Sequence, residues 1–161
     1  MLKDKEVSDL YNQNNLGEFE NKIGLNFKNK SLLITALSHR SKQGDQLTSG
    51  DENLRLGLIG DKLIDLVLYD FVYREGASLK EMNDARVLTE NEELNRVADD
   101  LGLRSYLFVD PSVNKLILKE SQSFGSNSVE GLVGSIFIDR GFEAAYCFVK
   151  TWILPKNSDS C

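Results

Sequence analysis

The chain has 161 residues, 41% of them hydrophobic, which suits one domain with its own core. Its apolar runs stay short of the roughly 20 residues that a membrane-spanning helix needs, so we expect no membrane segment. The formal net charge of −6 argues against a protein whose main function is to bind nucleic acid through a basic surface. A local basic patch, or an acidic site that meets phosphate through a divalent metal ion, remains compatible with this charge.

Helical periodicity dominates the sequence, and strand-like alternation is almost absent, so the predicted fold class is all-α. We expect a flexible N-terminus over residues 1–14, one domain over residues 15–154 and a flexible tail over residues 155–161. Two cysteines do not suggest a disulfide framework, and the polar N-terminal segment has no apolar core of a signal peptide. The expected localisation is therefore cytoplasmic.

The first predicted helices lie in the N-terminal part of the domain. Leu16, Phe19 and Ile23 fall on one helical face and form a short apolar stripe. Asn29 or Ser31 is suited to cap the next helix, because the side-chain oxygen of either residue can accept a hydrogen bond from a backbone N–H of the first turn.

A polar, glycine-containing segment over residues 42–52 predicts a loop, and the longest predicted helix follows it, over about residues 53–73. Apolar residues cover nearly the whole circumference of this helix, which is typical of a buried helix. In a small domain it is either the central helix or one that also meets a second subunit. We therefore expect a homodimer.

Two capping boxes predict successive short helices over about residues 79–88 and 90–101. In a capping box a hydroxyl and a carboxylate three residues apart satisfy backbone donors at the start of a helix. The two pairs are Ser78 with Glu81 and Thr89 with Glu92.

The C-terminal part of the domain contains two more predicted helices. Ser126 or Ser128 is expected to open a helix that ends near Asp139. Gly141 then separates it from a last apolar helix, which ends near Trp152.

Asp61 and Glu130 stand out because each is a carboxylate within a strongly apolar helical segment. Burying a charge without a partner is costly, so two such groups could share a hard cation such as Mg²⁺. Alternatively, each could cap a loop or pair with a basic side chain. On the same helix faces one turn earlier lie Gly57 and Asn127. A glycine inside a helix costs about 1 kcal/mol relative to alanine, so Gly57 needs a reason, of which close helix packing is one.

These residues fall within longer motifs, and through those motifs the sequence resembles the ribonuclease III endonuclease domain over about residues 17–154. Residues 23–41, IGLNFKNKSLLITALSHRS, resemble its opening helix. Residues 53–67, NLRLGLIGDKLIDLV, line up with the signature N-E-R-L-E-F-L-G-D-A-V-L-D-L, and residues 126–141, SNSVEGLVGSIFIDRG, with A-D-x-F-E-A-L-I-G-A-I-Y-L-D-x-G. The matching positions are Asn53, Arg55, Leu56, Gly60, Asp61, Asp65, Glu130, Gly134, Ile136, Asp139 and Gly141.

The resemblance implies an all-helical domain that dimerises through its signature helices. It also implies a site of four carboxylates that holds Mg²⁺ and cuts a phosphodiester bond of double-stranded RNA. Carried over residue by residue, Asp61 and Glu130 take the places of two of these carboxylates and are the candidate catalytic and metal-binding residues. The other two places are filled by Gly57 and Asn127, and the earlier glutamate of N-E-R falls on Leu54.

The two replacements put cleavage in doubt. Mg²⁺ prefers carboxylate and water oxygens in octahedral order, and Asn127 can offer only a neutral carbonyl oxygen, while Gly57 offers no side chain. Asp65 lies one turn beyond Asp61, but the family pattern has an acid there that is not a ligand. His39 matches a family histidine and is expected to be structural. A weaker candidate surface for the RNA backbone comprises Lys28, Lys30, Arg40 and Lys42.

Three functions follow as hypotheses. The first is a ribonuclease III-like protein that binds or acts on double-stranded or structured RNA with impaired or lost cleavage, in effect a pseudoenzyme. The second is an active endoribonuclease for RNA processing that uses Mg²⁺ or Mn²⁺ in a reduced site. The third is a helical dimerisation module without an RNA role.

Overall fold

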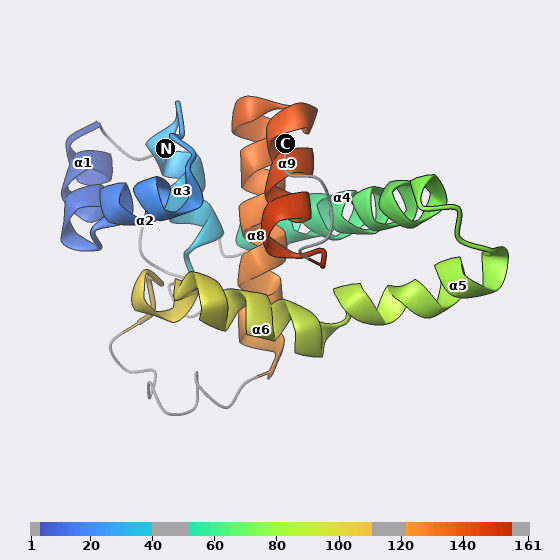
Figure 1. Cartoon of the computed structure of the whole chain (residues 1–161). Helices are drawn as coiled ribbons and strands as arrows, with labels where there is room; N and C mark the ends of the chain where they lie inside the picture. The colour runs from blue at the N-terminus through green and yellow to red at the C-terminus, as the bar shows by residue number, and fades with distance from the viewer. Residues whose placement is uncertain (1–3, 40–51, 111–121, 156–161) are drawn as a thin grey trace.

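The structure, a computed structural model, describes residues 4–39, 52–110 and 122–155. These residues fold into helices and connecting segments and contain no β-strand, which confirms the predicted all-α fold class. The long helix α8 (Gln122–Arg140) lies at the centre and contacts α3, α4, α6 and α9. Helix α4 (Glu52–Arg74) crosses it, and α9 (Phe142–Trp152) packs beside it (Figure 1).

The remaining elements surround these three helices. They are α1 (Asp4–Gln13), α2 (Leu16–Ile23), α3 (Lys30–Ala36), α5 (Leu79–Asp84), the 3-10 helix η2 (Ala85–Thr89), α6 (Asn91–Leu101) and the 3-10 helix η3 (Leu103–Ser105). No helix in the described parts of the chain is long and apolar enough to cross a membrane.

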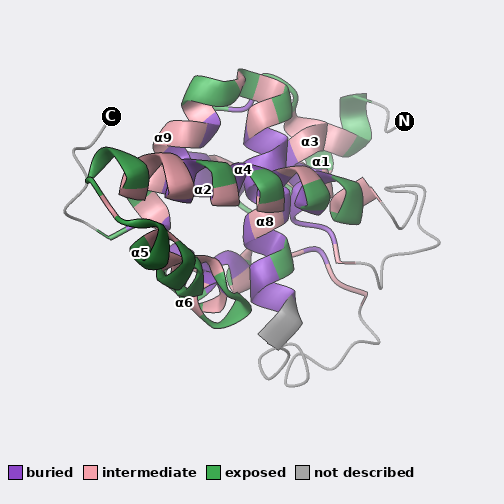
Figure 2. Cartoon of the chain, turned by 90° about the vertical axis from the view of Figure 1, so that its right-hand side faces the viewer, coloured by how far each residue is buried: buried purple, intermediate pink, exposed green. Residues whose placement is uncertain are grey.

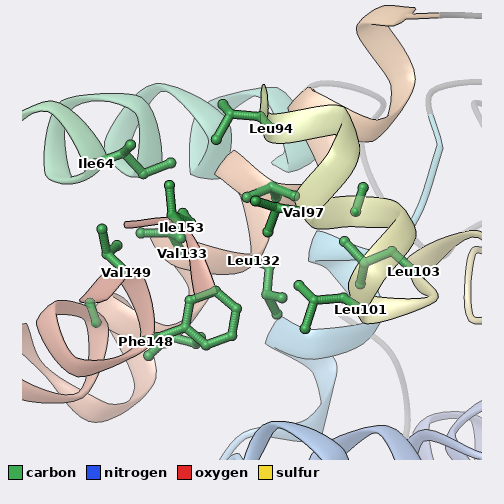
Figure 3. Close-up of a cluster of buried hydrophobic side chains, with 14 of the residues drawn as sticks. Ile64, Leu94, Val97, Leu101, Leu103, Leu132, Val133, Phe148, Val149 and Ile153 are labelled. Atoms are coloured by element: carbon green, nitrogen blue, oxygen red, sulfur yellow. The ribbon is translucent and has the colours of Figure 1, made fainter. Parts of the chain in front are cut away.

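The hydrophobic core lies where α4, α6 and α9 meet α8. Side chains from all four helices, such as Ile64, Val97, Leu132 and Phe148, point toward one another there (Figure 3). Helix α8 is buried along most of its length, whereas α5 is largely exposed (Figure 2). Since burying one large apolar side chain contributes about 1.5–3 kcal/mol, the packing around α8 is the main source of stability.

Helix α4 is central but is buried on one face only within this chain, so the alternative that it also meets a second subunit stays a prediction. Leu63, Ile64, Val67 and Leu68 face the core, and the glycines of its first half face α8. The opposite face carries large apolar side chains that are 43–71% exposed, namely Leu54, Leu58, Leu66 and Tyr73.

Two of the predicted helix caps are confirmed. Asn29, rather than Ser31, caps α3, because its Oδ1 accepts a hydrogen bond from the backbone N–H of Ser31 at 3.1 Å. Ser78 and Glu81 form the full capping box at the start of α5.

The second predicted capping box is wrong. Thr89 is the last residue of η2, and its hydroxyl donates to the backbone carbonyl of Arg86 at 3.0 Å, so it does not cap α6. Helix α8 also starts earlier than predicted, at residue 122, and Ser128 lies inside it with its hydroxyl donating to the carbonyl of Phe124. A hydroxyl that can bond back to its own helix in this way weakens serine as a marker of a helix start.

Helix α1 forms over residues 4–13, where the sequence predicts a flexible segment, and it contacts α2 and α3. Its Tyr11 hydroxyl donates to the buried carboxylate of Glu20. Glu20 also accepts from the backbone N–H of Phe27 at 2.6 Å and pairs with the Lys30 ammonium at 2.7 Å. The buried charge is therefore fully partnered, as burial in a core requires.

Candidate functional site

The candidate site lies where α4 crosses α8, and glycine sets the closeness of that crossing. A Cβ atom added to Gly60 would lie 1.8 Å from the backbone oxygen of Glu130, and one added to Gly134 would lie 2.1 Å from the backbone oxygen of Leu56. The two helices are thus in backbone contact, which only a residue without a Cβ allows. Glu130 on α8 is thereby fixed against the first half of α4.

Gly57, by contrast, does not owe its identity to this packing. A Cβ atom added there would lie 3.8 Å from Oε2 of Glu130, which is an ordinary van der Waals distance. Close helix packing therefore explains Gly60 but not Gly57. At Gly57 the helix leaves room for a Cβ atom beside the Glu130 side chain.

The two candidate carboxylates lie within electrostatic reach of each other, since the charge of Asp61 acts on Glu130. Glu130 is mostly buried, and this burial raises its pKa from 4.5 to about 7, with the charges of Asp61 and Asp65 adding to the effect. The nearby ammonium of Lys62 acts in the opposite direction. We call Asp61, Asp65 and Glu130 the acidic site.

Lys62 is the member of the site that sequence reasoning missed. Its Nζ lies 2.9 Å from Oδ2 of Asp61, in an ion pair whose two side chains are both largely exposed. The hydrogen bond and charge of Asp61, together with the charge of Asp65, raise the pKa of Lys62. The available signal was the family signature, which has alanine where this chain has Lys62.

The residues present do not fit a Mg²⁺ site. Gly57 supplies no oxygen, Asp61 is paired with Lys62, and Asn127 is an exposed neutral amide one turn before Glu130. Asp65 accepts a hydrogen bond from the Thr89 hydroxyl at 3.4 Å. Within the described ranges no three Asp, Glu, His or Cys side chains are grouped so that they could hold a metal ion. Hard divalent cations need several oxygen ligands, and this arrangement falls short of that number.

Other motif residues hold the scaffold together. The Asn53 side chain donates to the carbonyls of Thr35 and Ala36 at the end of α3, where the Thr35 carbonyl also accepts from the backbone N–H of Ser38. At the other end of α3, the carboxylate of Asp139 accepts from the backbone N–H groups of Lys28 at 2.7 Å and Asn29 at 2.8 Å. These side chains fix α3 to α4 and α8.

His39 has structural contacts, in agreement with the sequence prediction. Its ring lies 4.7 Å from the ring of Phe124, measured between centroids, and its backbone N–H donates to the carbonyl of Phe108 at 2.8 Å.

Two of the four basic residues predicted to contact RNA, Lys28 and Lys30, lie in the described part of the chain. Lys28 is exposed, whereas Lys30 is held by the buried Glu20 and lies over the Tyr11 ring. Arg40 and Lys42 lie outside the described residues.

Comparison with known proteins gives matches over most of the chain. The pattern of the ribonuclease-III-like family matches residues 29–157. Ribonuclease 3 of Borreliella afzelii is 30% identical over 137 residues, covering 83% of this chain and 56% of that protein. Ribonuclease 3 of Desulfotalea psychrophila is 31% identical over 155 residues, covering 93% of this chain and 64% of that protein. The chain thus spans less than two thirds of these relatives.

Solved structures agree with the sequence matches. A crystal structure of the nuclease domain of ribonuclease III from Campylobacter jejuni superposes with a TM-score of 0.76 and 26% identity, covering 91% of this chain and 98% of that one. A second structure of that domain, which concerns flexibility in a region involved in dimer formation, gives a TM-score of 0.75 and 25% identity over 84% of this chain and 93% of that one. The chain therefore belongs to the ribonuclease III family and has the fold of its endonuclease domain.

Proposed function

We propose that this chain binds double-stranded or structured RNA as a ribonuclease III-like protein whose cleavage is impaired or lost. The observation that carries the proposal is the space at Gly57. This space adjoins the Glu130 carboxylate and can hold a Cβ atom. The family resemblance has a glutamate at this position. The absence of that glutamate is therefore not explained by backbone contact between the helices, and it removes an expected ligand beside Glu130.

The protonation of Glu130 supports the same conclusion. With a pKa of about 7, the carboxylate carries a proton for part of the time at neutral pH. Asp61 and Glu130, the two candidate catalytic residues, then offer a cation fewer than two full negative charges. Affinity for Mg²⁺ or Mn²⁺ falls accordingly, because hard cations are held mainly by charged oxygen ligands.

A homodimer is part of the proposal. The exposed face of α4 is apolar, with Leu58 69% exposed and Leu66 54% exposed. Exposed apolar patches of this kind often mark sites of protein–protein contact. The nuclease domain of the Campylobacter jejuni enzyme has a region involved in dimer formation. Leu58→Glu should shift the chain from dimer to monomer in sedimentation equilibrium, whereas Leu79→Glu, on the exposed α5, should leave the dimer intact.

The test of impaired cleavage uses a long RNA duplex with Mg²⁺ and, separately, with Mn²⁺. We expect the purified wild-type chain to retard the duplex in a gel without cutting it, and Gly57→Glu/Asn127→Asp to restore some cutting. In that background Asp61→Asn should abolish the restored activity, which controls for a contaminating nuclease. Clear cutting by the wild type at low-millimolar Mg²⁺ would contradict the proposal.

A second candidate, an active endoribonuclease with a reduced site, is favoured by the retention of Asp61 beside Glu130. It requires that Asp61→Asn or Glu130→Gln removes a cleavage activity of the wild-type chain. The third, a dimerisation module without an RNA role, is favoured by the net charge of −6 and requires that no salt-dependent shift of duplex RNA is seen. A cytoplasmic location fits any of the three and stays a prediction.

A further inference from the structure

Lys62 places a positive charge beside the carboxylates of the acidic site. Its Nζ is 2.9 Å from Asp61, it is also attracted by Asp65, and it partly offsets the effect of burial on Glu130. A single ammonium group therefore acts on all three carboxylates of the site. Ammonium is a compact charge with three donors, all of which seek oxygen lone pairs.

We infer that Lys62 is the built-in counter-ion of the acidic site and that it excludes divalent cations from it. The inference rests on the proposed function, since it gives the impaired cleavage a second cause besides the missing carboxylates. The two causes are separable, because Gly57 removes a ligand whereas Lys62 occupies one oxygen atom of a ligand that is still present.

The electrostatic argument has two parts. The Lys62 ammonium and a divalent ion would compete for Oδ2 of Asp61. If the Lys62 side chain rotated away from Asp61, its short aliphatic chain would still hold the ammonium charge near the acidic site. A divalent ion about 6 Å from an ammonium in water is repelled by an energy that corresponds to roughly tenfold in affinity, and salt reduces this figure. The exposure of the ion pair means that Lys62 can be removed without disturbing the core.

The experiment measures Mn²⁺ binding to the full chain at low salt and neutral pH, by paramagnetic resonance of the free ion and by the shift in Tm that the metal produces. The variants are Lys62→Ala and, as a matched control, Lys80→Ala, which removes an exposed lysine of α5 away from the site. Both are also placed in the Gly57→Glu background. No RNA is present, so the outcome does not depend on whether the chain binds or cuts RNA.

We expect Lys62→Ala to raise Mn²⁺ affinity about three- to tenfold over Lys80→Ala in the Gly57→Glu background, and to enlarge the metal-induced Tm shift. Asp61→Asn should cancel this gain. Equal affinity of the two lysine variants, within twofold or with no binding in either, would overturn the inference. So would a gain that survives Asp61→Asn, because the metal would then bind elsewhere.

Discussion

Gly57 and Gly60 lie one turn apart on α4, and the same residue of α8, Glu130, is the nearest neighbour of both. At Gly60 the neighbour is the Glu130 backbone, and no Cβ atom can be accommodated. At Gly57 the neighbour is the Glu130 side chain, and a Cβ atom fits. The crossing of the two helices is thus set by backbone contact, whereas the chemistry beside it depends on side chains that can be exchanged. A fold of this kind can lose its metal site without losing its shape.

Breaking the crossing should have the largest effect. Gly60→Ala and Gly134→Ala place a Cβ atom against backbone oxygen, so α4 and α8 must move apart. We expect each substitution to lower the free energy of unfolding by about 3 kcal/mol, near the upper end of the usual range for overpacking. Urea unfolding followed by circular dichroism measures this. A loss below 0.5 kcal/mol would show that the helices are not in backbone contact.

The acidic site should reveal itself in the pH dependence of stability. The pKa of Glu130 is raised to about 7 in the folded chain from an ordinary value of 4.5, so the folded state binds more protons between these values. The contribution of Glu130 is therefore greatest below pH 4.5 and declines as the pH rises to about 7. Glu130→Gln removes this decline. We expect the variant to match wild type at pH 4.5 and to exceed it by about 2–3 kcal/mol at pH 8.

Asn53 links the crossing to α3 and should have an intermediate effect. Asn53→Ala removes the donor for the carbonyls of Thr35 and Ala36. We expect a loss of about 1–2 kcal/mol in the free energy of unfolding, because the Ala36 carbonyl loses this donor, whereas the Thr35 carbonyl keeps the backbone N–H of Ser38. Asn127→Ala removes an exposed asparagine of α8 and serves as the control, with an expected change within about 0.5 kcal/mol. Equal effects of the two variants would show that the Asn53 hydrogen bonds do not stabilise the fold.

Filling the space at Gly57 should give the smallest effect, and one of opposite sign. Gly57→Ala adds a methyl group at an ordinary contact distance and replaces a poor helix former by a good one. We expect the chain to become up to about 1 kcal/mol more stable in the same urea titration. Gly76→Ala provides the contrast, because Gly76 has a φ of 80°, where alanine is strained. Destabilisation by Gly57→Ala would mean that close packing does account for this glycine.

Much of the scaffold could be predicted from the sequence. The 3.6-residue pattern predicts the long helices, and Asn29 and the Ser78 capping box mark helix starts correctly. The three family motifs also align Asp61 and Glu130 with two acidic positions of the family, and in the structure the charge of Asp61 acts on Glu130. These features depend on local patterns or on matched positions, both of which a single sequence contains.

Other features depend on contacts that no local pattern encodes. The Thr89 hydroxyl can cap a helix or bond elsewhere, and the choice is made by η2 and by Asp65 across the fold. The different roles of Gly57 and Gly60 follow from the register in which α8 crosses α4. The partner of Lys62 depends on the direction of a flexible side chain, which apolar periodicity does not address.

The hydrogen bonds from Lys28 and Asn29 to Asp139 join residues that are 111 and 110 positions apart. The two backbone donors just before α3 are therefore satisfied only when the end of α8 is in place. During synthesis on the ribosome, the N-terminal third of the domain emerges long before this partner. Native structure in that third should consequently be acquired late, in a cooperative step with the C-terminal helices, rather than sequentially from the N-terminus.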